Sequence, residues 1–497
     1  MKIICNKLIC LATALCLLLG LTIGWSGVAM AETQTAQDAA LTVQEGEMPF
    51  GEPPEGTPPG GFGGDRPEGT PPGGMGQPPS GGMPGGAPGG SSDSIDYSGA
   101  VEITSAANES DETYASVTAD ESALLISTSE TVAITNPTVT KSGSSDGGDN
   151  CNFYGLNAAI LAKDGANVTI TGGTITSDAS GANGVFSYGG NGGHNGAAGD
   201  GTTVTIRDTV ITTTGSGSGG IMTTGGGVTY AYDLTVTTSG QSSAAIRTDR
   251  GGGTVYVDGG TYTTNGLGSP AIYSTADIHV SGAALESTLS EGVCIEGKNS
   301  IELVDCDLTA NNTRCNGNAT FLDSIMIYQS MSGDADSGTS TFAMTGGKLT
   351  SLNGHVFHVT NTNAVINLSG VELVNEDGEG VLLSVCDDGW SGAGNVATLN
   401  ADNQVLEGLL LVGSDSTLTL DLANASAFTG TVSGQITNAK GDVVSTELGT
   451  VHVTLDDSSV WTLTGDAYIS SFTGDAANII SNGYTLYVDG VALTGTK

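Results

Sequence analysis

The stretch that decides the fold is "VTITGGTIT", residues 168–176, because its pattern recurs along most of the chain. Two apolar residues separated by one polar residue are followed by a Gly or Asp turn, then by another apolar residue and Thr. "VTIRDTVIT", residues 204–212, repeats the pattern closely. Further apolar triplets at the same places are Val255-Val257-Tyr262, Ile278-Val280-Leu285, Ile301-Leu303-Leu308, Phe342-Met344-Leu349 and Ile366-Leu368-Leu373. Alternation with period two predicts short β-strands that turn one row of side chains inward.

The spacing of these copies predicts how the strands are arranged. Copies lie 23 or 24 residues apart where no insertion intervenes (255 to 278, 278 to 301 and 342 to 366). That distance is too long for a hairpin and suits one coil of three short strands. A single coil cannot bury its apolar row, whereas stacked coils share a continuous core. The repeats therefore predict a parallel solenoid.

This coil pattern resembles the right-handed parallel β-helix of the pectin-lyase-like kind, found in secreted polysaccharide-processing enzymes and bacterial surface proteins. The resemblance covers about residues 100 to 430 and implies an all-β fold, a single-stranded right-handed parallel β-helix. The Asn-Thr-Asp, Asp-Asp, Gly-His-Gly and Arg-Ile-Lys elements of polygalacturonases are absent, as are the pectate-lyase motifs. "NGHVFH" contains Gly354-His355 but no second Gly. The resemblance therefore carries no catalytic residues onto this chain.

Composition divides the chain into four segments. Residues 1–31 read as a secretory signal peptide, with Lys2 and Lys7 before the apolar run "LICLATALCLLLG" and Ala29-Met30-Ala31 at the cleavage site. Residues 32–98 read as a disordered Pro/Gly-rich spacer, in which "PEGTPPGG" occurs twice. Residues 99–430 are the predicted β-helix, and 431–497 are C-terminal β coils or a cap. We expect a protein that is secreted, with an extracellular or cell-surface location.

Charge excludes some partners. Without Lys2 and Lys7, 11 basic residues remain against 53 acidic ones, a net charge of −42. Such a surface repels nucleic acid and anionic membranes, and no segment after the signal peptide is apolar enough to span a bilayer. No cofactor is evident. Ca²⁺ would suit acidic loops such as "CDDGW", but EF-hand spacing is absent and no metal ligands are assigned.

A second strand precedes each triplet, and stacking its copies predicts two columns of side chains. The predicted inward column is Ile160, Phe186, Ile221, Ile246, Ile272, Ile295, Ile327, Phe357 and Leu383. The next residue of each strand must point outward. The predicted outward column is Leu161, Ser187, Met222, Arg247, Tyr273, Glu296, Tyr328, His358 and Ser384.

This outward column gathers unusual side chains for a chain with only 13 Lys and Arg. Asp249 and Lys298 follow two positions further along, with Arg250 and Gln329 beside them. We expect one contiguous exposed patch of Arg247, Asp249, Tyr273, Glu296, Lys298, Tyr328 and His358. Insertions at 189–201, 332–340 and 386–395 would wall a groove over it, while the insertion at 310–321 leaves from another corner. The alternative is that these charges form ordinary surface ion pairs and that the tyrosines simply pack.

Aromatic platforms with mixed charge suit a saccharide. The substrate-binding candidates are Arg247, Arg250, Tyr273, Lys298, Tyr328, Gln329 and His358. The three cations would grip carboxylates or sulfates, which predicts a local positive patch and an acidic ligand. We expect an adhesin or glycan-binding rod that binds extracellular polysaccharide. The alternative is an enzyme: a glycoside hydrolase with Glu296 and Asp249 as an inverting carboxylate pair two coils apart, or a uronate lyase with Lys298, Arg247 or Tyr328 as base.

Overall fold

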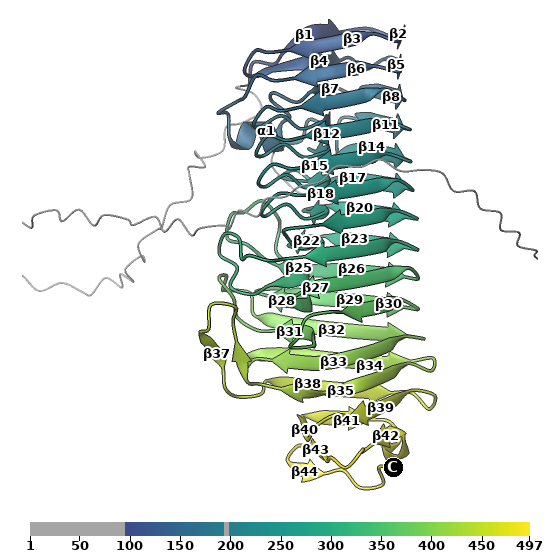
Figure 1. Cartoon of the computed structure of the whole chain (residues 1–497), viewed down its shortest axis with the longest axis vertical. Coiled ribbons are helices and arrows are strands. Elements are labelled where there is room, and N and C mark those ends of the chain that lie inside the picture. The colour runs from purple at the N-terminus through teal and green to yellow at the C-terminus, as the bar shows by residue number, and fades with distance from the viewer. Residues whose placement is uncertain (1–94, 193–197) are drawn as a thin grey trace, which may run out of the picture. The chain divides into compact units, whose positions relative to one another are not determined.

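The computed structural model describes residues 95–192 and 198–497. The predicted signal peptide and nearly all of the predicted spacer lie outside these residues. In the described part, strands follow one another in coils that lie one below the next from β1 to β44 (Figure 1). The chain forms three long parallel sheets in which every third strand pairs over most of the stack, which confirms a single-stranded parallel β-helix.

Sheet A has 15 strands in the described residues, and it carries the columns predicted above. They are β1 (Ser98–Ile103), β4 (Glu121–Ser127), β7 (Ile160–Lys163), β10 (Val185–Tyr188), β13 (Ile221–Thr224), β16 (Ile246–Thr248), β19 (Ile272–Ser274), β22 (Val293–Glu296), β25 (Asp323–Tyr328), β28 (His355–Thr360), β31 (Val381–Val385), β33 (Val405–Val412), β35 (Ala427–Ser433), β39 (Val460–Leu463) and β42 (Ile479–Ile480).

Sheets B and C contain the two strands of each repeated triplet. Sheet B consists of β2 (Ala107–Ser110), β5 (Thr131–Thr135), β8 (Asn167–Thr171), β11 (Thr203–Arg207), β14 (Gly227–Tyr232), β17 (Gly253–Asp258), β20 (Asp277–Ser281), β23 (Ser300–Val304), β26 (Thr339–Thr345), β29 (Asn363–Ser369), β32 (Asn395–Asp402), β34 (Ser416–Ala423), β38 (Thr450–Leu455) and β41 (Ser471–Thr473). Sheet C consists of β3 (Thr113–Ser116), β6 (Thr138–Lys141), β9 (Thr174–Ser177), β12 (Val210–Thr213), β15 (Thr235–Thr238), β18 (Thr261–Thr264), β21 (Ala284–Ser287), β24 (Asp307–Asn311), β27 (Lys348–Asn353) and β30 (Glu372–Asn375).

The opening stretch "VTITGGTIT" spans β8, a tight corner and β9 as its pattern predicts. Val168 and Ile170 pair with Val204 and Ile206 of the next coil, and all four side chains are buried. The corner glycines have positive φ, 68° at Gly172 and 80° at Gly173, a conformation that glycine adopts without steric cost. Asp208 has φ 52° at the matching corner of the next coil, since short polar side chains tolerate this region.

A different corner, between sheets C and A, is held by buried serines. The hydroxyl of Ser218 accepts a hydrogen bond from Ala182 N, that of Ser243 from Ser218 N, and that of Ser269 from Ser243 N, each at 2.9 Å. All three serines are fully buried. Because a buried backbone N–H without an acceptor costs free energy, each serine stabilises the coil before it.

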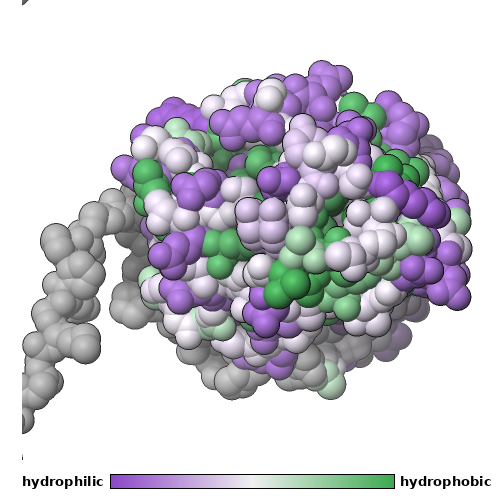
Figure 2. Space-filling view, turned by 90° about the horizontal axis from the view of Figure 1, so that it is seen from below, coloured by the Kyte–Doolittle hydropathy of each residue, from purple (hydrophilic) through white to green (hydrophobic). Residues whose placement is uncertain are grey.

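Sheet C ends at β30, while sheets A and B continue toward the C-terminus. An antiparallel pair, β36 (Ile436–Thr437) and β37 (Val443–Ser445), and a small sheet of β40 (Ala467–Ile469), β43 (Leu486–Val488) and β44 (Val491–Ala492) follow. On the face seen from that end, hydrophobic residues appear in small groups among hydrophilic ones (Figure 2). None of the helices in the described residues is long and apolar enough to cross a membrane.

Candidate functional site

The register of sheet A corrects the predicted columns in two places. Phe186 points outward, opposite Leu161 and Met222, and Ser187 points inward. The outward face is apolar there because it packs against Phe153 and Tyr154, from a segment that contains the helix α1 (Asp149–Phe153). This cover makes the strand buried on both sides, so alternation does not reveal its orientation.

The second correction is a shift of two residues. Tyr273 lies opposite Cys294, and Glu296 lies opposite Tyr328. His358 lies opposite Met326. A shift of two residues leaves every side chain on the same face of the sheet, so hydrophobic alternation cannot detect it. The outward side chains of β22 and β25 therefore belong to two neighbouring columns instead of one.

Three of the predicted residues, Tyr273, Glu296 and Tyr328, meet in a pocket of about 440 Å³ over sheet A. Trp390 and Met331 also line it, together with residues 316–319. Its walls come from the insertions at 332–340 and 386–395, as predicted, and also from 310–321. The described residues of the insertion at 189–201 (189–192 and 198–201), by contrast, do not line it.

Glu296 lines this pocket and is only 2% exposed. Its Oε2 accepts hydrogen bonds from the hydroxyls of Tyr273 at 2.5 Å and Tyr328 at 3.0 Å. Its Oε1 accepts from the hydroxyls of Ser330 and Ser332. Burial and the neighbouring Glu296 hold the pKa of both tyrosines well above its usual value, so both remain hydroxyl donors. Four hydroxyl groups thus fix the orientation of one carboxylate.

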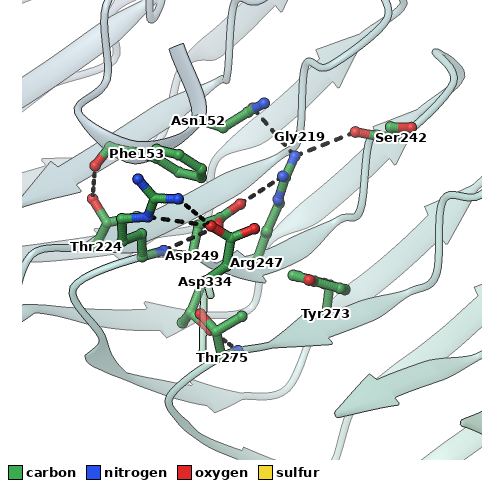
Figure 3. Close-up of polar contacts among 12 residues, drawn as sticks. Asn152, Phe153, Gly219, Thr224, Ser242, Arg247, Asp249, Tyr273, Thr275 and Asp334 are labelled. Atoms are coloured by element: carbon green, nitrogen blue, oxygen red, sulfur yellow. Dashed lines mark hydrogen bonds and ion pairs between the residues drawn. The ribbon is translucent and has the colours of Figure 1, made fainter. Parts of the chain in front are cut away.

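Arg247 and Asp249 contact each other near Tyr273 (Figure 3), and Arg250 N donates a hydrogen bond to Asp249 Oδ1 at 2.9 Å. The Arg247 guanidinium lies 2.7 Å from the Asp249 carboxylate and also donates to Asn152 Oδ1 at 3.2 Å. Burial raises the pKa of Asp249 to about 6, although Arg247 opposes this shift. Asp249 is 3% exposed and does not line the pocket that contains Glu296. The structure therefore does not bring the predicted catalytic pair, Glu296 and Asp249, into one cavity.

Arg250 holds the insertion at 332–340 in place. Its guanidinium lies 2.5 Å from Asp334 and 4.2 Å from the centre of the Phe153 ring. Gln329, which is buried, donates from Nε2 to Ala335 O at 3.2 Å and shapes the same insertion. This loop reaches across two intervening coils, and Asp334 forms part of the pocket wall.

The predicted positive patch is wrong, because each of its three cations faces a carboxylate. Arg247 pairs with Asp249, Arg250 with Asp334, and Lys298 with Asp336 at 2.9 Å. Lys298 is exposed and lies outside the lining of the pocket. The alternative of ion pairing is therefore the correct description of these charges.

The predicted exposure of His358 is also wrong, since its side chain is 0% exposed. Its Nδ1 lies 2.7 Å from Ser384 Oγ, its Nε2 lies 3.3 Å from Asp388, and Phe321 stacks on its ring. Asp388 accepts hydrogen bonds from Thr320 N and Oγ1, both at 2.7 Å. Burial alone would raise the pKa of Asp388, but His358 and Thr320 outweigh it and lower that pKa. This cluster ties the insertions at 310–321 and 386–395 to sheet A.

Sequence reasoning also missed the carboxyl group of Glu291, which lines the pocket. It is 5% exposed, accepts from the Ser290 hydroxyl and lies near the buried Asp323. Burial raises the pKa of Glu291, and burial together with Glu291 raises that of Asp323. "SEGVCIEG" at 290–297 places both glutamates around β22, but only the turn before Val293 brings Glu291 to the pocket.

Trp390 was missed as well, and its signal was present in the loop "CDDGW". Its ring centre lies 4.9 Å from that of Tyr328, with an interplanar angle of 51°. Trp390 is separated from Tyr328 by 62 positions, so its place over the pocket depends on the fold of the insertion. A large aromatic residue in a Gly- and Asp-rich excursion was the available indication.

A second aromatic group lies on the outer face of sheet B. Tyr230, Tyr256 and His279 of consecutive coils are stacked, with centres 5.2 and 5.1 Å apart. His279 Nδ1 lies 2.9 Å from Glu302. Together with neighbouring side chains, this stripe lines a separate pocket of about 360 Å³ on sheet B. It provides a control surface for the pocket of sheet A.

Within the described residues, no group of three or more His, Cys, Asp or Glu side chains is arranged to hold a metal ion. The five cysteines of this part, Cys151, Cys294, Cys306, Cys315 and Cys386, are free thiols. The chain was also compared with known proteins. No protein-family model, curated protein or solved structure matches it.

Proposed function

We propose that this protein binds an extracellular polysaccharide in the pocket formed by Tyr273, Glu296, Tyr328 and Trp390. The observation that carries the proposal is the combination of three aromatic rings and three carboxyl groups around one cavity of about 440 Å³. This volume lies within the range of small-ligand sites, which are mostly apolar with few oriented polar groups. Aromatic faces pack on the apolar faces of sugars, while Glu296 and the serines would bind hydroxyl groups.

The segment order supports an extracellular role. A predicted signal peptide and a Pro/Gly-rich spacer precede the β-helix, as expected for a binding domain displayed away from a surface. The coil pattern also resembles the pectin-lyase-like proteins, many of which act on polysaccharides. Fold resemblance alone does not determine function, so the pocket is the main support.

The test is a binding panel of neutral, acidic and amino-sugar oligosaccharides against the full chain. Trp390→Ala removes one wall of the pocket and should weaken binding about tenfold, equivalent to about 1.4 kcal/mol. Tyr256→Ala, on the stacked stripe of sheet B, is the matched control and should leave affinity unchanged. Equal binding by wild type and Trp390→Ala would rule out this pocket.

A second candidate is hydrolysis of a glycosidic bond in the same pocket. It is favoured because the pocket holds two glutamates in different environments: Glu291 is buried, and Glu296 accepts hydrogen bonds from four hydroxyls. Burial raises the pKa of Glu291, so it can donate a proton to the leaving oxygen. Glu296, held by four hydroxyls, would accept a proton from the attacking water, and water adds across the broken bond. New reducing ends with wild type, but not with Glu291→Gln or Glu296→Gln, would establish hydrolysis. Binding without turnover would establish a binding protein.

A further inference from the structure

The pocket over sheet A is electronegative. Its acidic lining residues are Glu291, Glu296 and Asp334, and no Lys, Arg or His belongs to the lining. Asp334 is neutralised by Arg250 at 2.5 Å. Glu296 is contacted by four hydroxyls, which orient it but carry no formal charge. A ligand that enters therefore meets a carboxylate without a cationic partner among the described residues.

The neighbouring Arg247 and Arg250 cannot neutralise the negative charge of the pocket without giving up the ion pairs that they already form. Arg247 is held by Asp249 at 2.7 Å, and Asp249 is itself buried. Freeing the Arg247 guanidinium would leave the buried Asp249 carboxylate without its cationic partner, which is strongly unfavourable. A uronate would thus face the Glu296 carboxylate with no available cation. The chain as a whole, with net charge −40, adds to the repulsion.

The aromatic rings of the pocket are arranged to attract a cation. The Arg247 guanidinium already lies 5.6 Å from the centre of the Tyr273 ring. The rings of Tyr328 and Trp390, which also line the pocket, have centres 4.9 Å apart and stand at 51° to each other. An ammonium group near Glu296 would meet π faces as well as a carboxylate, and desolvated cation–π contacts are strong.

We propose that the pocket selects a saccharide that carries a protonated amino group, with its ammonium placed against Glu296 between the aromatic rings. This inference rests on the proposed function, and it names the ligand class of that site. It replaces the acidic ligand predicted from the sequence, because the structure pairs every cation on which that prediction depended.

Isothermal titration with three matched probes tests the inference: a β-1,4-linked glucosamine tetramer, its fully N-acetylated form and a galacturonate tetramer. We expect the glucosamine tetramer to bind at least tenfold more tightly than the other two. Its affinity should fall between 50 and 300 mM NaCl, because charge attraction is screened by salt. Glu296→Gln should lose about tenfold, whereas Glu302→Gln on sheet B should bind as wild type does.

Two outcomes would overturn different claims. Equal or tighter binding of the N-acetylated or galacturonate tetramer overturns the cationic preference and leaves a saccharide site in place. No binding of any of a wide panel of saccharides overturns the proposed function itself. If Glu296→Gln does not fold, as judged by its thermal transition, the selectivity of the wild-type protein among the three probes still decides the inference.

Discussion

Single buried groups in this β-helix have pKa values that are set by what surrounds them. His355, next to His358, has its pKa lowered to about 3, first by burial and then by His358. In the unfolded chain the same imidazole titrates near 6.5. The unfolded state therefore binds a proton first as the pH falls, so this histidine removes stability on acidification between about pH 6.5 and 3.

We predict that His355→Gln flattens this part of the stability profile. At pH 4.5 the neutral buried histidine should cost the wild type about 3 kcal/mol relative to pH 7.5. Urea denaturation at the two pH values measures the loss, and the variant should show a loss smaller by about that amount. An equal loss in both proteins would mean that His355 is protonated, or is solvent-exposed, in the native state.

At the level of strands and corners, two glycines at the corner between sheets C and A are fixed by close approach. A Cβ on Gly240 would lie 1.8 Å from Gly215 O, and one on Gly266 would lie 1.8 Å from Gly240 O. Neither glycine has a positive φ, so the constraint is contact with the preceding coil. The coils can stack at this corner only while the side chain is absent.

Gly240→Ala should therefore destabilise the protein by about 3 kcal/mol or more, because the clash is with backbone that cannot move aside. Gly378 has no atom within 4 Å of its Cβ position and no unusual φ, which makes Gly378→Ala the control. We expect the control to unfold at the wild-type temperature. A calorimetric scan that shows the same transition for all three proteins would contradict the packing at this corner.

The buried serine corner makes a second prediction at this level. Ser243→Ala removes the acceptor for Ser218 N and a donor to Gly215 O. A buried N–H without a partner costs about 1–3 kcal/mol, so the unfolding free energy should fall by about that much. Ser180→Ala, at a surface turn whose side chain is not buried, serves as a comparison. Similar midpoints for both variants would argue against the hydrogen-bonded ladder.

The sequence predicted the strands of this structure better than it predicted the insertions. Alternation predicted the inward row of "VTITGGTIT" correctly, because a one-residue slip would expose the core. Alternation could not detect the two-residue shift at β22. The shift leaves the Glu296 side chain pointing outward but places Cys294, and not Glu296, opposite Tyr273. Nor could it place Asp334 against Arg250, 84 positions earlier, since the path of an insertion depends on contacts far apart in sequence. The sequence therefore placed the candidate site on the correct sheet but identified only some of its residues.

Across the complete chain, the dominant property is its net charge of −40. Mutual repulsion of acidic side chains destabilises a compact state, and salt screens that repulsion. We predict that raising NaCl from 20 to 500 mM increases the midpoint of thermal unfolding by several degrees. A calorimetric midpoint that falls with salt would show that ion pairs such as Arg250–Asp334 outweigh the repulsion.

Hydrogen–deuterium exchange of the full chain, with and without the tightest-binding oligosaccharide, tests most directly whether the pocket over sheet A binds saccharide. We predict slower exchange at 290–296, 316–319 and 328–334, which surround Glu296, and no change at 228–232 and 254–258 of sheet B. Protection confined to sheet B, or unchanged exchange throughout, would contradict the assignment of this pocket as the binding site.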